Sequence, residues 1–267
     1  MDAARTPAQT APAVGKVWLV GAGPGAPDLL TLRAARVLAE ADIVFYDALV
    51  NPEIVALATR AEKVAVGKRC GKHSTAQRFI NKRLVDAART HAQVVRLKGG
   101  DPMMFGRAQE EIDALLEAGI ACEVVPGITA ALAASAQVGV SLTRRAVARS
   151  VTFATPRVGV DEARSDWAAS VVGADTAVLY MSVRDAGGIA AELMARGKPA
   201  GTPVAVVRNA SLPDSEILFT TLAGLAHGLG EDQRPAVLCI GEVYRQAMSL
   251  SLGDTGAFAL LQANQRC

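Results

Sequence analysis

Short apolar runs alternate with amphipathic stretches along the first half of the chain, and glycine or proline ends several of the runs. Such runs are typical of strands buried on both faces, and helical segments lie between them. The alternation therefore predicts an α/β unit with a parallel sheet and helices on its faces. The predicted strands cover residues 16–20, 43–46, 63–66, 94–97 and 121–125.

Three amphipathic segments separate these runs. In the first, Leu29, Leu32, Ala35 and Leu38 recur at helical spacing. The second would begin with Ser74 or Thr75 as its cap. Its apolar face comprises Phe79, Ile80, Leu84, Val85 and Ala88, and the third segment covers residues 109–118.

The pattern restarts in the second half, with predicted strands at 150–154, 176–180, 204–207 and 237–240 and helices near 185–196 and 222–229. Between the halves, residues 120–143 form a nearly uncharged stretch that contains Pro126 and Gly139, which favours a buried connection over a membrane span. We therefore predict two α/β domains, at 16–127 and 128–250. A disordered leader at 1–15 and a tail at 251–267 flank them.

Composition narrows the class of protein. Apolar residues make up 51% of the 267 residues and charged residues 20%, which indicates a compact globular chain. The net charge of +2 gives no reason to expect a nucleic-acid or membrane partner. Four scattered cysteines and no signal peptide predict a reducing cytoplasm, and the three histidines are not spaced as metal ligands.

Glycine-rich corners end three of the predicted strands: Gly21-Ala-Gly-Pro-Gly25, Gly99-Gly100-Asp101-Pro102 and Pro126-Gly127. The first fits the G-x-G-x-x-G/A template of dinucleotide-binding proteins, with Asp47 at the end of the next strand. Pro24, however, removes an amide that a pyrophosphate would need. A nucleoside ligand without phosphates suits these corners better, and Asp101 is the carboxylate that we expect to bind it.

Basic residues cluster just beyond these corners. Lys68 and Arg69 share one loop, Arg107 follows the second corner, and Arg145 follows the connection between the halves. Arginine holds carboxylates through two parallel hydrogen bonds, so these residues predict a polyanionic substrate. Glu110 and its neighbour Glu111 open a helix, where the helix dipole favours negative side chains without any catalytic role.

Taken in order, a series of motifs resembles the tetrapyrrole methyltransferases, and within them the uroporphyrinogen-III C-methyltransferases. The series runs from about residue 16 to 247. It comprises Val17-Trp-Leu-Val-Gly-Ala-Gly-Pro-Gly25, Leu29-Leu-Thr-Leu32, Tyr46-Asp-Ala-Leu-Val50, Gly67-Lys-Arg69, Val95-Arg-Leu-Lys-Gly-Gly-Asp-Pro102, Phe105-Gly-Arg107, Val124-Val-Pro-Gly-Ile-Thr-Ala130, Val151-Thr-Phe153, Tyr180-Met181 and Gly241-Glu-Val243.

The resemblance implies two α/β domains of the tetrapyrrole methylase type, with S-adenosylmethionine in the cleft between them, and a homodimer. The substrate would be uroporphyrinogen III, methylated twice to precorrin-2, with S-adenosylhomocysteine as the other product. The implied cofactor residues are Pro24, Gly99, Gly100, Asp101, Met104, Thr129, Ala130, Met181 and Ala210. The implied substrate residues are Lys68, Arg69, Arg107, Arg145 and Met181, and the candidates for acid-base work are Arg107, Glu110 and Asp47.

The chain departs from this family at Ala26, Ala108-Gln109, Arg144 and Thr155-Pro-Arg157. Two alternatives therefore stay open: an NAD(P)-dependent oxidoreductase built on the first corner, and a non-catalytic tetrapyrrole-binding homologue. Precorrin-2 feeds sirohaem, cobalamin and haem d1, so the sequence does not select a pathway. At this length we expect methylation alone, without a dehydrogenase or ferrochelatase domain.

Overall fold

A computed structural model describes residues 14–66, 73–158, 165–230, 232 and 234–253. Most of the predicted leader and nearly all of the predicted tail lie outside these residues, as do Lys68 and Arg69. The chain divides into two compact units, one of residues 1–23 and 27–127 and the other of residues 24–26 and 128–267. No helix in the described part is long and apolar enough to cross a membrane.

The first unit is built on a five-stranded parallel sheet in the order β3-β2-β4-β1-β5. Its strands are β1 (Lys16–Gly21), β2 (Ile43–Tyr46), β3 (Glu62–Ala65), β4 (Gln93–Lys98) and β5 (Cys122–Val125). The prediction of a parallel sheet is confirmed. Because β1 lies between β4 and β5, the three glycine corners follow three neighbouring strands.

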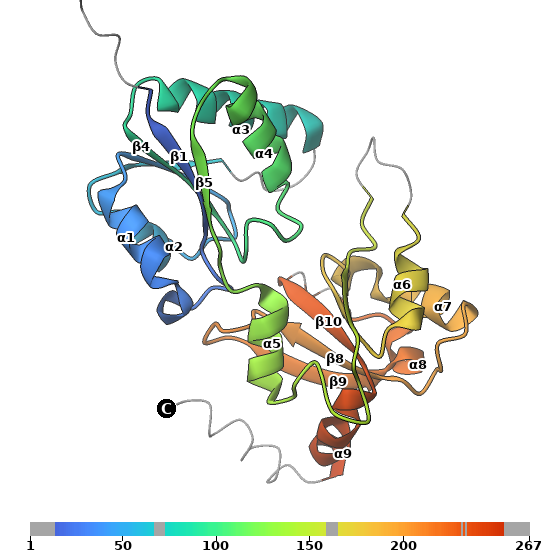
Figure 1. Cartoon of the computed structure of the whole chain (residues 1–267). Coiled ribbons are helices and arrows are strands. Elements are labelled where there is room, and N and C mark those ends of the chain that lie inside the picture. Colours follow the sequence, from blue (N-terminus) through green and yellow to red (C-terminus); the bar gives the residue numbers. More distant parts are fainter. Residues whose placement is uncertain (1–13, 67–72, 159–164, 231, 233, 254–267) are drawn as a thin grey trace, which may run out of the picture. The chain divides into compact units, whose positions relative to one another are not determined.

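Helices cover both faces of this sheet (Figure 1). On one face lie α1 (Leu32–Glu40) and α2 (Pro52–Ala56), and on the other α3 (His73–Ala88) and α4 (Ala108–Glu117). A short 3-10 helix, η1 (Pro27–Leu29), precedes α1. The side chain of Thr31 caps α1 by accepting a hydrogen bond from the amide of Ala34 at 3.1 Å.

Several details of the predicted helices are wrong. Leu32, assigned to the apolar face, is 84% exposed, because α1 begins there and turns Ala34, Val37 and Leu38 to the core instead. Phe79 is 55% exposed and lies beside the guanidinium of Arg83. The expected caps of α3, residues 74 and 75, lie inside the helix, which begins at His73.

The second unit holds a mixed five-stranded sheet in the order β6-β7-β10-β8-β9. Only β6 (Val151–Ala154) and β7 (Thr176–Leu179) pair in parallel; β8 (Pro203–Arg208), β9 (Glu216–Thr221) and β10 (Ala236–Gly241) join through antiparallel pairs. The strand β9 was not predicted. It is an edge strand that borders only β8, and three of its residues, Glu216, Thr220 and Thr221, are polar, so its apolar run is only three residues long.

Helices also cover both faces of the second sheet (Figure 1). One apolar cluster includes α5 (Ala130–Val138) and α9 (Arg245–Gly253), and the other includes α6 (Trp167–Gly173), α7 (Ala186–Ala195) and α8 (Leu222–Leu225). The short 3-10 helices η2 (Val183–Asp185) and η3 (Glu242–Tyr244) precede α7 and α9. The predicted connection at 120–143 thus contains a helix, α5, and α6 was not predicted.

Candidate active site

The three glycine corners of the first unit meet at the carboxyl ends of β4, β1 and β5. Gly23 and Gly100 exchange two backbone hydrogen bonds, of 3.1 and 2.7 Å. A Cβ atom on Gly127 would lie 2.3 Å from the carbonyl oxygen of Gly100, and one on Gly21 would lie 2.6 Å from the amide nitrogen of Gly127. Close backbone contact therefore explains why glycine stands at positions 21 and 127.

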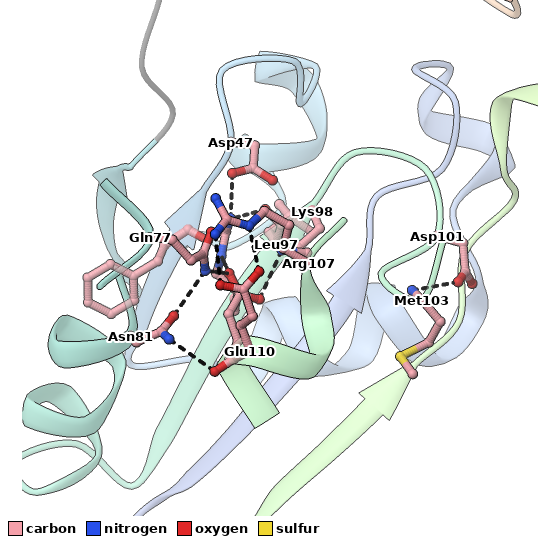
Figure 2. A network of polar contacts seen from close by, with 12 residues as sticks. Asp47, Gln77, Asn81, Leu97, Lys98, Asp101, Met103, Arg107 and Glu110 are labelled. Carbon is pink, nitrogen blue, oxygen red and sulfur yellow. Dashed lines mark hydrogen bonds and ion pairs between the residues drawn. The ribbon is translucent and has the colours of Figure 1, made fainter. Parts of the chain in front are cut away.

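Asp101 ties these corners together. Its Oδ2 accepts a hydrogen bond from the amide of Gly127 at 2.9 Å. Its Oδ1 accepts one from the amide of Met103 at 2.8 Å (Figure 2). Met104 also donates its amide to the Asp101 carbonyl at 3.2 Å. The carboxylate thus holds the corner after β4 against the corner after β5, and each oxygen keeps a second lone pair for a ligand.

Gly99 differs from the glycines that the fold itself requires. A Cβ atom there would have one neighbour within 4 Å, the Cβ of Leu49 at 3.8 Å, and the backbone of Gly99 is outside the left-handed region. Neither packing nor backbone conformation within the chain demands a glycine at this exposed position. The space beside Gly99 suits a ligand that approaches the backbone closely, and in this respect the corner fits a nucleoside cofactor.

Beneath this corner lies a network of buried charges that the sequence did not reveal (Figure 2). The side chains of Arg96, Lys98 and Glu111 are 2%, 4% and 0% exposed. Glu111 accepts hydrogen bonds from Arg96 Nε at 2.9 Å and from Lys98 Nζ at 2.9 Å. Arg96 also donates from Nη2 to Asp47 Oδ1 at 2.5 Å. Asp47, a predicted catalytic residue, is therefore bound to a buried arginine.

Burial and neighbouring charges act in opposite directions on this network. Desolvation alone would lower the pKa of Arg96, but the charges and hydrogen bonds of Asp47 and Glu111 raise it above the ordinary value. The pKa of Lys98 is lowered, first by desolvation and then by repulsion from Arg96, against the opposing attraction of Glu111. One feature of the sequence hints at this network. Arg96 and Lys98 are two residues apart in a strand, so their side chains point to the same face of the sheet.

Arg107 and Glu110 lie together at the start of α4. Arg107 donates from Nε to Glu110 Oε1 at 2.6 Å and from Nη2 to Oε2 at 2.7 Å, and both side chains are partly exposed. Arg107 and Phe105 both have left-handed backbone conformations, with φ of 56° and 53°. The structure thus pairs two predicted site residues with each other, on a strained segment of the kind that often occurs at functional sites.

The second unit brings together another group of predicted residues. Tyr180 shares a 2.7 Å hydrogen bond with the hydroxyl of Thr129, and its phenol oxygen accepts the amide of Ala131 at 3.2 Å. The next residue, Met181, has a left-handed φ of 54° and is 48% exposed. Thr129 and Ala130 at the start of α5 therefore lie close to the Tyr180-Met181 pair.

Ala210 lies between two residues in the left-handed region, Asn209 and Ser211. The hydroxyl of Ser211 accepts the amide of Ala26 at 3.1 Å, so the segment 24–26, with Pro24, reaches this loop. Arg145 is exposed and belongs to the turn closed by the bridge between Arg144 and Ala148.

The first corner does not continue into a helix as a dinucleotide site requires. After Ala26 come η1 and the capping residue Thr31, and α1 begins only at Leu32. The N-terminus of α1 is thus six residues beyond the glycine template, which counts against a pyrophosphate bound there. Asp47, which would bind the ribose in such a site, is bound to Arg96 instead.

Residues 16–226 match the family model of the tetrapyrrole (corrin/porphyrin) methylases. The chain belongs to this family. Its curated relatives include siroheme synthase 1 of Yersinia pseudotuberculosis, 47% identical over 86% of this chain and 49% of the relative. The siroheme synthase of Psychrobacter sp. is 46% identical over 86% of this chain and 48% of that protein. The chain thus spans about half the length of these relatives.

Among solved structures, the fold resembles uroporphyrin III C-methyltransferase from Thermus thermophilus. The native form has 40% sequence identity and a TM-score of 0.76, over 87% of this chain and 94% of that chain. A second structure of the Thermus enzyme, a complex with S-adenyl homocysteine, matches equally well. The predicted family and its α/β fold are therefore confirmed.

Proposed function

We propose that this tetrapyrrole methylase is a uroporphyrinogen-III C-methyltransferase, which transfers two methyl groups from S-adenosylmethionine to one substrate molecule and forms precorrin-2. The observation that carries the proposal is the corner at Gly99–Asp101, where open space adjoins a glycine that the fold does not need. The 40% identity to an enzyme captured with S-adenyl homocysteine supports the same cofactor for this chain.

The cofactor residues that we propose fall into two groups. Gly99, Gly100, Asp101 and Met104 belong to the first unit, and Pro24, Thr129, Ala130, Met181 and Ala210 belong to the second. When bound, S-adenosylmethionine supplies a methyl group already activated by its positive sulfur. The protein then has mainly to hold the two reactants in a fixed relative position.

The substrate carries eight carboxylates, and arginine is well suited to bind them. We propose that Arg107 exchanges Glu110 for a substrate carboxylate, because both partners of this pair are partly exposed and an exposed pair is weak. Lys68, Arg69, Arg145 and Met181 are the other substrate residues that we propose. After this exchange Glu110 would lie near the substrate, but its negative charge would repel the substrate carboxylates.

After each methyl transfer the substrate loses a proton, and we propose that Asp47 accepts it. Arg96 binds Oδ1 of Asp47, and the Asp47 side chain is 31% exposed. Asp47 can therefore receive a proton on its other oxygen and pass it to solvent.

Titration of the purified chain with S-adenosylhomocysteine and NADH, followed by anaerobic incubation of uroporphyrinogen III with methyl-labelled S-adenosylmethionine, tests the proposal. We expect binding of S-adenosylhomocysteine and two labelled methyl groups per product. NADH binding without S-adenosylhomocysteine binding would favour the oxidoreductase. Tetrapyrrole binding without methyl transfer would favour the non-catalytic homologue.

The homodimer and the cytoplasmic location also remain predictions. Light scattering on a size-exclusion column measures the mass in solution, and we expect twice the 27.7 kDa of one chain. Cell fractionation tests the location.

A further inference from the structure

The carboxylate of Glu111 is the centre of the buried network in the first unit. Besides the bonds from Arg96 and Lys98, it accepts one from Gln77 Nε2 on α3 at 3.2 Å. Three donors thus surround one fully buried carboxylate. A buried ion pair is costly to desolvate, and apolar residues of similar volume often stabilise a fold equally well. Stability alone is therefore a weak explanation for this network, and its contacts suggest another.

Arg96 uses its whole guanidinium group within this network. Nε binds Glu111, Nη2 binds Asp47, and Nη1 donates to the carbonyls of Leu97 at 3.2 Å and Phe45 at 3.5 Å. Because the guanidinium is planar and rigid, fixing Nε on one side fixes the position of Nη2 on the other. The place of the Asp47 carboxylate at the end of β2 therefore depends on Glu111, which does not touch it.

We propose that Glu111 is a positioning residue, which orients the guanidinium of Arg96 so that Arg96 holds the Asp47 carboxylate where it accepts the substrate's proton. This role rests on the function proposed above. In the step concerned, the substrate carbon releases H⁺, the electron pair of the broken C–H bond returns to the conjugated ring system, and the proton forms an O–H bond on Asp47. Glu111 itself exchanges no proton.

The substitution Glu111→Gln preserves shape but removes the charge that balances Arg96 and Lys98. The amide keeps one acceptor oxygen in place of two, so Arg96 and Lys98 compete for it. Asp47 then faces two cations with no second carboxylate beside them. We expect a less well placed Asp47 and a fall in kcat of about tenfold to hundredfold, the range typical of small displacements of catalytic groups.

The experiment compares wild type, Glu111→Gln and Gln77→Met, the last a milder change that removes one neutral donor to Glu111. Glu123→Gln is the matched control, because Glu123 pairs with Lys16 at 2.6 Å in the same sheet but both side chains are more than a third exposed. Calorimetry with S-adenosylhomocysteine counts the active sites and gives the affinity. Anaerobic methyl transfer to uroporphyrinogen III at one fixed pH gives kcat per site and KM.

In Glu111→Gln we expect S-adenosylhomocysteine affinity and KM for uroporphyrinogen III each within about threefold of wild type, and a lower kcat per site, because the displaced Asp47 carboxylate affects the proton transfer rather than the binding of either reactant. Gln77→Met should show a smaller fall in kcat, and Glu123→Gln none. A kcat per site equal to wild type in both network variants, or a fall confined to KM or to S-adenosylhomocysteine affinity, would overturn the positioning role. If Glu111→Gln does not fold, Gln77→Met decides alone. A wild-type chain that transfers no methyl group overturns the proposed function itself, and the positioning role with it.

Discussion

Two glycines at the candidate cofactor corner should respond in opposite ways to the same substitution. Gly99→Ala adds a methyl group whose one neighbour within 4 Å is an ordinary contact at 3.8 Å, whereas Gly127→Ala places a methyl group 2.3 Å from the carbonyl oxygen of Gly100. Gly99→Ala should therefore preserve the stability of the fold and weaken cofactor binding, whereas Gly127→Ala should lower the stability of the fold.

The magnitudes follow from these distances. Replacing glycine by alanine where the backbone allows it stabilises a protein by about 0.4–1 kcal/mol, because the unfolded chain loses freedom, and we expect this for Gly99→Ala. In Gly127→Ala the backbone must shift, which costs about 1–3 kcal/mol, as overpacking typically does. If S-adenosylhomocysteine lies against Gly99, the added methyl group overpacks the complex instead of the fold. The same cost of about 1–3 kcal/mol then weakens binding, and the affinity for S-adenosylhomocysteine should drop by about five- to 150-fold.

Urea unfolding measures the stability of each variant, and calorimetry measures its affinity for S-adenosylhomocysteine. The matched control is Gly173→Ala in the second unit, where a Cβ atom would meet nothing within 4 Å and the backbone is not left-handed. It should leave S-adenosylhomocysteine affinity unchanged. If Gly99→Ala binds S-adenosylhomocysteine as tightly as wild type, the cofactor does not lie against this corner and the reasoning fails.

Three further predictions concern the second unit. Tyr180→Phe removes the partner of Thr129 and of an amide in the first turn of α5, and urea unfolding should show a loss of about 1–3 kcal/mol. Lys198→Met removes a buried ammonium that donates to carbonyls at the end of α6, and should lower the thermal midpoint without changing S-adenosylhomocysteine affinity. Hydrogen bonds from Arg234 lower the pKa of Asp232 from 3.8 to about 2; its contribution to stability is therefore present above pH 4 and is lost as the pH falls toward 2. Asp232→Asn should flatten this part of the stability curve, and an unchanged curve would contradict the assignment.

The parallel sheet of the first unit was predictable because its strands are short apolar runs between clear breaks. The strands β1 to β5 each begin and end within one residue of the predicted run. Burial on both faces makes β1, β2 and β4 visible in the sequence, whereas the edge strand β3 is mostly exposed. The second sheet was less predictable. The strand β9 has an apolar run of only three residues, and α5 is alanine-rich on all sides, with no polar face to indicate a helical period.

The residues of the site divide in the same way. The glycine corners and Asp101 were predictable because turns at strand ends have a distinctive composition. The buried network was not, because Arg96 and Lys98 look like solvent-facing positions in a strand, and Glu111 like an ordinary acidic residue in the first turn of a helix. Only the packing of α4 against the sheet brings the three side chains together, away from water.

The contact between Gly21, Gly100 and Gly127 also limits which second mutations can repair damage at this corner. The atoms that an alanine at 127 would strike belong to the backbone, so no side-chain replacement elsewhere removes them. In α8, by contrast, an alanine at Gly224 would strike the hydroxyl of Thr220, which a second substitution can delete. A genetic selection for restored growth should thus return suppressors of Gly224→Ala at position 220, but for Gly127→Ala chiefly reversion to glycine.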